Sequence, residues 1–200
     1  MSTPPGEYYT EERWNNWLDR LREEDIDPDE EDSARLLLNL QDDTAIAVAK
    51  IVTEYDDDEL GEEAALEELG RIRDIVLSEV AFDDEEKLML IDGVQTSLVC
   101  VFYAAEEYVA GGPAEYDDDL AAAAALEEYV RAAADAEEQE DLDTALAYCA
   151  KAGTLLFEGG TLDMDVAEEI DYGLVAEWVN GLDSLGTALA DPEVIDEDDG

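Results

Sequence analysis

The sequence predicts an all-α protein, a single bundle of about seven helices around a central apolar helix at residues 88–109. Apolar residues recur along most of the chain at the spacing of three to four that one helix face requires, and no stretch shows convincing strand-like alternation. The segment 88–109, LMLIDGVQTSLVCVFYAAEEYV, is apolar on nearly every side. Because a helix of that kind is surrounded by other elements, we expect it to form the core.

The chain begins with a Pro- and Gly-containing segment, residues 1–9, which we expect to be a flexible lead-in. Thr10 is a suitable N-cap for a first helix that ends near Asp25, ahead of Pro28. Its apolar positions follow the i, i+3, i+4, i+7 pattern and are Trp14, Trp17, Leu18 and Leu21. The sequence therefore predicts an amphipathic helix here.

Two further helices are expected before the central one. The second is predicted from about residue 29 to residue 55 and the third over residues 62–80, with an acidic loop between them. Asp83 and Asp84 precede the central helix and are suited to its positive end. The central helix should stop at Gly111-Gly112-Pro113, the strongest helix-breaking signal in the chain.

Three helices are predicted after this break, over about 117–138, 142–157 and 165–189. The last of them contains three glycines, each costing about 1 kcal/mol relative to alanine inside a helix; these are Gly173, Gly181 and Gly186. Close approach of a neighbouring helix and local bending both explain such glycines. The predicted helical domain spans residues 10–190, and residues 191–200 form an acidic tail that we expect to be disordered.

Charge is the dominant compositional feature. Fifty-eight acidic residues against ten basic ones give a net charge of −48. Self-repulsion at this density persists in dilute buffer and is screened in molar salt, where the Debye length falls to about 3 Å. The composition resembles that of proteins from extremely halophilic archaea, which indicates a cytoplasm rich in K⁺. Direct nucleic-acid binding is disfavoured because it depends on Lys and Arg at phosphates.

The residue inventory also argues against most catalytic sites. The chain has no histidine, only Cys100 and Cys149 as thiols, and no glycine-rich phosphate-binding motif. This inventory excludes His-dependent triads and His-ligated or four-thiolate zinc sites. The first ten residues do not resemble a secretory signal, and the apolar runs are too short to cross a bilayer. We therefore expect a soluble, cytoplasmic protein that is not an enzyme and holds no cofactor.

The loop at residues 56–67 is the nearest approach to a metal motif. Asp56, Asp58 and Glu67 occupy positions 1, 3 and 12 of a calcium-binding helix-loop-helix, with Gly61 at position 6. Leu60, however, stands at position 5, where an oxygen ligand is usual. A solvated acidic loop is one interpretation, and a divalent-cation-responsive protein is the alternative.

The N-terminal helix carries the strongest signal for a partner. Trp and Arg are enriched at binding hot spots, and this segment supplies four candidates: Arg13, Trp14, Trp17 and Arg20. Packing of the same tryptophans onto the chain's own bundle is the alternative. The sequence thus indicates a non-enzymatic protein–protein interaction or structural module that binds another protein or a second copy of itself.

Two resemblances accompany these inferences. Residues 125–157 resemble a tetratricopeptide-type hairpin at Ala145, Tyr148 and Ala152, without a second copy of the repeat. The segment YYTEERWNNWLDRLREED, together with the acidic helical remainder, resembles the uncharacterised archaeal domain-of-unknown-function family 2150. That resemblance implies an archaeal helical protein and supplies no activity, cofactor or catalytic residue.

Overall fold

The computed structural model describes residues 4–27, 30–170 and 172–190, and all regular structure in these residues is α-helical. The elements run in the order α1 (Glu11–Glu23), α2 (Glu31–Asp56), α3 (Glu62–Val76), α4 (Glu85–Gly111), α5 (Ala122–Glu138), α6 (Leu142–Phe157), α7 (Met164–Glu169) and α8 (Leu174–Ala190). The predicted all-α class is confirmed. The predicted acidic tail, residues 191–200, lies outside the described residues.

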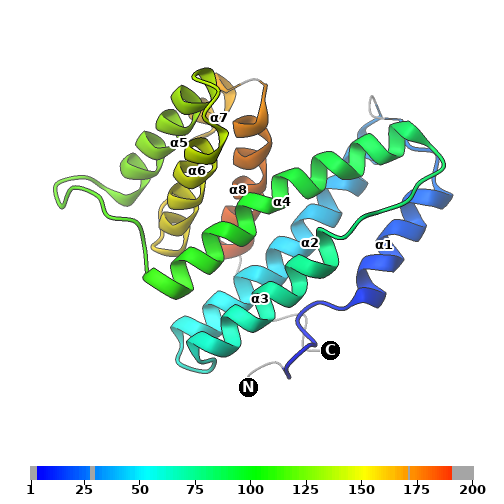
Figure 1. The fold of residues 1–200 in the computed structure, drawn as a ribbon, viewed down its shortest axis with the longest axis horizontal. Helices are drawn as coiled ribbons and strands as arrows, with labels where there is room; N and C mark the ends of the chain where they lie inside the picture. Colours follow the sequence, from blue (N-terminus) through cyan, green and yellow to red (C-terminus); the bar gives the residue numbers. More distant parts are fainter. Residues whose placement is uncertain (1–3, 28–29, 171, 191–200) are drawn as a thin grey trace.

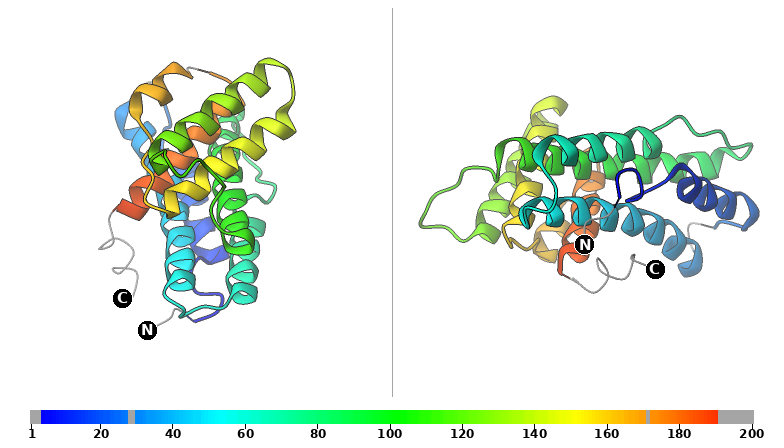
Figure 2. Two further views of the ribbon diagram at one scale, coloured as in Figure 1. Left: turned by 90° about the vertical axis from the view of Figure 1, so that its left-hand side faces the viewer. Right: turned by 90° about the horizontal axis from the view of Figure 1, so that it is seen from below.

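α4 is the central helix, as predicted. It crosses the molecule with α2 and α3 on one side and α6 and α8 on the other, and packs against all four (Figures 1 and 2). Its polar strip is open to solvent at Asp92 and Tyr103. The buried side chains come from both of its apolar faces and include Ile91, Val94, Leu98, Val101, Phe102, Ala105 and Tyr108. Burial on two faces explains why the segment is apolar nearly all round.

The last predicted helix is in fact two helices, which is why the described chain has eight and not seven. The break falls at Gly173, whose φ of +106° is open to glycine and strained for other residues. Glu137, at the end of α5, accepts hydrogen bonds from the backbone N–H groups of Leu174 (2.7 Å) and Val175 (3.2 Å). A carboxylate from another helix therefore caps α8 and stabilises its separate start.

Two other helix ends differ from the prediction. α5 begins at Ala122 and not near residue 117, because the Asp117 side chain accepts the N–H of Asp119 and forms a turn. α3 ends at Val76 and not at residue 80, because the Gln95 side chain of α4 donates to the carbonyl oxygens of Val76 and Ser78. α6, by contrast, has the predicted bounds. It forms a helical hairpin with α5 (Figure 1).

Glycine allows α6 and α8 to approach α4 closely. A Cβ atom at Gly181 of α8 would lie 2.1 Å from the Ser97 carbonyl oxygen, and one at Gly153 of α6 would lie 2.5 Å from Ala104 Cβ. The Ser97 hydroxyl also donates to Glu177 of α8, at 3.2 Å. Of the two explanations that the sequence left open, close approach of a neighbouring helix therefore accounts for Gly181.

Residues 4–9 do not form the flexible lead-in that was expected. Tyr8 and Tyr9 are each 1% exposed, and the Tyr8 hydroxyl bonds the buried carboxylate of Glu54. The Gly6 N–H donates to the Glu68 carboxylate at 3.0 Å. Burial, together with the Glu54 carboxylate, raises the pKa of Tyr8. The segment is thus tied to α2 and α3, and the ordered domain begins before residue 10.

α4 is the one helix in the described part of the chain that is long and apolar enough to cross a membrane, judged by length and composition alone. Its uninterrupted apolar runs are short, which is why run length alone did not indicate a possible membrane span in this segment. Half of its most apolar stretch is buried inside the bundle. A core helix of a soluble protein has the same properties.

Candidate partner-binding site

The four residues proposed for partner binding lie on α1, and Trp14 belongs to the core. Its side chain is 3% exposed and is buried beside Leu18 and Leu21. Thr10 caps the helix as predicted, accepting the N–H of Arg13 at 3.2 Å. The apolar stripe of α1 therefore docks largely onto the chain's own bundle, which is the alternative interpretation of this segment.

The polar groups of Arg13, Trp17 and Arg20 are also engaged within the chain. Arg13 makes a bidentate ion pair with Asp43 of α2, and Trp17 donates its indole N–H to that carboxylate at 2.8 Å. Arg20 stacks over the Trp17 ring, 5.0 Å from its centroid, and pairs with Glu24 at 3.7 Å. The structure brings the four residues together on α1, where Arg13 and Trp17 bond Asp43 of α2 and Arg20 packs on Trp17.

The three residues of the alternative metal site do not converge. Asp56 accepts hydrogen bonds from the Tyr108 hydroxyl at 3.2 and 3.3 Å, and Glu67 lies within 3.6 Å of Arg71. Asp58 occupies the left-handed region at φ +59°. Burial raises the pKa of Asp56, and Glu158 adds a like-charge contribution. Among the described residues no group of three potential ligands could hold a metal ion.

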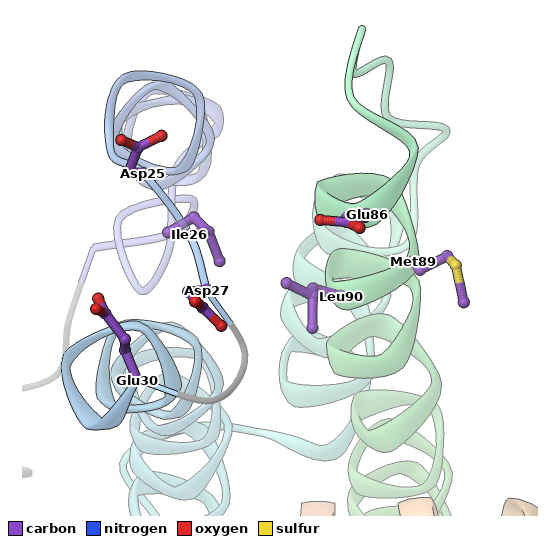
Figure 3. Close-up of a pocket in the computed structure, with 7 residues that line it drawn as sticks. All are labelled: Asp25, Ile26, Asp27, Glu30, Glu86, Met89 and Leu90. Atoms are coloured by element: carbon purple, nitrogen blue, oxygen red, sulfur yellow. The ribbon is translucent and has the colours of Figure 1, made fainter.

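A cleft of about 930 Å³ opens between the α1–α2 connection and the start of α4. Figure 3 shows its two walls, with residues 25–27 and Glu30 on one side and α4 on the other. The residues that line it are Asp25, Ile26, Asp27, Glu30, Glu86, Met89 and Leu90. It is therefore formed by segments about 60 residues apart in the sequence, which a hydrogen bond from the Lys87 ammonium group to the Glu24 carbonyl links.

Lys87 links α4 to the end of α1 beside the cleft. Its ammonium group donates to the carbonyl oxygens of Arg22 (3.1 Å) and Glu24 (2.7 Å), at the end of α1. A cation at a helix C-terminus also complements the helix dipole. On the other wall, Asp84 caps α4 by accepting the N–H of Glu86 at 2.9 Å. The cleft thus lies beside the first two turns of a capped helix.

The walls present apolar and acidic side chains in facing pairs. Ile26 and Leu90, both half-buried, point toward each other across the cleft, and Asp27 and Glu86 point into it from opposite sides (Figure 3). Met89 is 73% exposed and lies at the outer edge of the α4 wall, pointing away from the other wall. Such a site can bind an apolar group, a cation, or one ligand that combines the two.

Sequence reasoning missed this site, although a signal for it was present. Residues 88–91 are four consecutive apolar residues in a helix, and successive residues there point about 100° apart. Four in a row cannot all face one core. Ile91 is buried, whereas Leu90 is half-buried and Met89 is exposed. An apolar surplus at a helix start indicates a second apolar surface.

Comparison with known proteins gives a family and no function. Neither the curated proteins nor the solved structures contain a match to this chain. The family model that matches covers residues 7–198, from the buried N-terminal segment through both walls of the cleft and α8. The resemblance seen in the sequence is therefore confirmed, and the chain belongs to DUF2150, the family described as an uncharacterised protein conserved in archaea.

Proposed function

We propose that this chain is a non-enzymatic protein–protein interaction module of a halophilic archaeal cytoplasm, and that the cleft of Ile26 and Leu90 is its docking site. The observation that carries the proposal is an open apolar surface at the start of α4. Leu90 is only half-buried there and faces Ile26 across the cleft, although the chain has a well-buried core. Accessible apolar groups gathered at a cleft favour binding of another molecule.

The same structure argues for the cleft over α1 as the docking site. Trp14 is buried, and Arg13 and Trp17 share Asp43. A partner would have to displace these contacts before it could use α1. In the cleft, by contrast, the apolar side chains of Ile26 and Leu90 already face an open volume. Burial of α4 against four helices favours a soluble location.

The halophilic setting leads to a salt prediction. A net charge of −48 lies on an accessible surface of 10,880 Å². We expect helicity or compactness to be lost below about 0.5 M KCl, where the Debye length exceeds roughly 4 Å and repulsion is weakly screened. Circular dichroism across a KCl series measures this. Full cooperative stability in dilute buffer would show that the charge does not require a salty compartment.

The docking proposal is tested by affinity purification at native salt. The tagged chain is expressed in a host with multimolar cytoplasmic KCl and purified from a lysate kept at that salt. We expect Leu90→Ser to lose a co-purifying protein that the wild type retains. Leu142→Ser is the matched control, because Leu142 is a 43% exposed leucine at the start of α6 and does not line the cleft. Equal recovery by both variants would refute the proposal.

A further inference from the structure

The charges of the cleft restrict what can enter it. Both walls carry carboxylates, with Asp25, Asp27 and Glu30 on one and Glu86 on the other, and no Lys or Arg lines the cleft among the described residues. The nearby cation, Lys87, is bonded to the backbone at the end of α1. An acidic segment, including one from a second copy with its net charge of −48, would meet like charges on two sides.

Carboxylates alone would not make this cleft selective, because the chain has 58 acidic residues. In a K⁺-rich solvent any exposed carboxylate is also screened by K⁺. The distinguishing feature is the apolar pair Ile26 and Leu90 between the acidic residues (Figure 3). A hydrated K⁺ ion gains nothing from that pair. A side chain with an apolar stem and a cationic end contacts both kinds of group.

Arginine fits this combination better than lysine. Its guanidinium is planar, weakly hydrated and able to bond two carboxylates, and its methylene groups pack on apolar surfaces. Resting on the docking function proposed above, we propose that the cleft receives an arginine-bearing segment of a protein partner. The arginine stem lies between Ile26 and Leu90, and the guanidinium lies against Glu86 on the α4 wall.

The test uses short fluorescein-labelled peptides and the full chain in about 3 M KCl, where the Debye length is below about 3 Å. The probe peptide carries arginine and leucine. In the first control peptide citrulline replaces arginine, which keeps the shape and removes the charge. In the second, glutamate replaces arginine. Fluorescence anisotropy measures the dissociation constant of each peptide.

We expect the arginine peptide to bind about tenfold more tightly than the citrulline peptide, and the glutamate peptide not to bind. Glu86→Gln should raise the dissociation constant of the arginine peptide about fivefold and leave that of the citrulline peptide unchanged. Glu107→Gln is the matched control, because Glu107 is exposed on the same helix and far from the cleft. Leu90→Ser should raise the dissociation constant of the arginine peptide about tenfold, and Leu142→Ser should leave it unchanged.

The outcomes separate the two proposals. If the citrulline peptide binds as well as the arginine peptide and Leu90→Ser weakens both, the arginine assignment is wrong and the docking site stands. If Glu86→Gln and Glu107→Gln weakened binding of the arginine peptide equally, the peptide would be attracted by the overall negative charge of the protein and not by the cleft. That result also overturns the arginine assignment. If the arginine peptide does not bind at millimolar concentration, the arginine assignment fails. Binding that is insensitive to Leu90→Ser would remove the cleft from both proposals.

Discussion

Replacing Trp14 with alanine should lower the free energy of unfolding by about 3–5 kcal/mol, the usual cost of truncating a buried aromatic side chain. Trp14 is 3% exposed and lies on the α1 stripe with Leu18 and Leu21. The loss is a large part of the total stability of a domain, which is about 5–15 kcal/mol. Urea unfolding in multimolar KCl, followed by circular dichroism, measures the change.

Two matched variants make this result specific. Trp14→Phe should cost less than Trp14→Ala, because it keeps an aromatic ring and removes an indole N–H that has no hydrogen-bond partner in the described structure. Tyr172→Ala, at a side chain that is 88% exposed, should change stability by less than about 0.5 kcal/mol. If Trp14→Ala unfolded like the wild type, α1 would return as the leading partner-binding surface.

A pair of glycine substitutions within α8 should shift stability in opposite directions. Gly181→Ala should destabilise the fold by about 1–3 kcal/mol or more, because the new Cβ would lie 2.1 Å from the Ser97 carbonyl oxygen of α4. The conflict is with backbone, so it is relieved only if the two helices move apart. Gly186→Ala should stabilise the fold by up to about 1 kcal/mol, since the nearest neighbouring atom, on Leu156, is 3.6 Å away.

The same unfolding experiment measures both glycine variants, and helix propensity favours alanine equally at the two positions. Any difference between them therefore reports the contact between α8 and α4. Stabilisation by both substitutions would mean that the helices are farther apart than described. Destabilisation by both would mean that α8 depends on glycine flexibility along its whole length.

The sequence by itself determined the elements whose signals are local. The central helix, the bounds of α6 and the Thr10 cap all follow from residues within a few positions of each other. Helical periodicity and capping need no knowledge of the rest of the fold. For the same reason, the consecutive apolar residues 88–91 already contained the signal for an accessible apolar surface.

Tertiary structure decided what depends on distant residues. The start of α8 is set by Glu137, 37 residues before Leu174, so a glycine that costs only about 1 kcal/mol in a helix became a break. Trp17 and Arg13 face inward because Asp43 lies on the neighbouring α2. The cleft lies between segments that are distant in the sequence, and Lys87 links them by bonding the carbonyl of Glu24, 63 residues earlier. Periodicity shows that a face is apolar, whereas only packing determines whether that face meets the core or remains open to a partner.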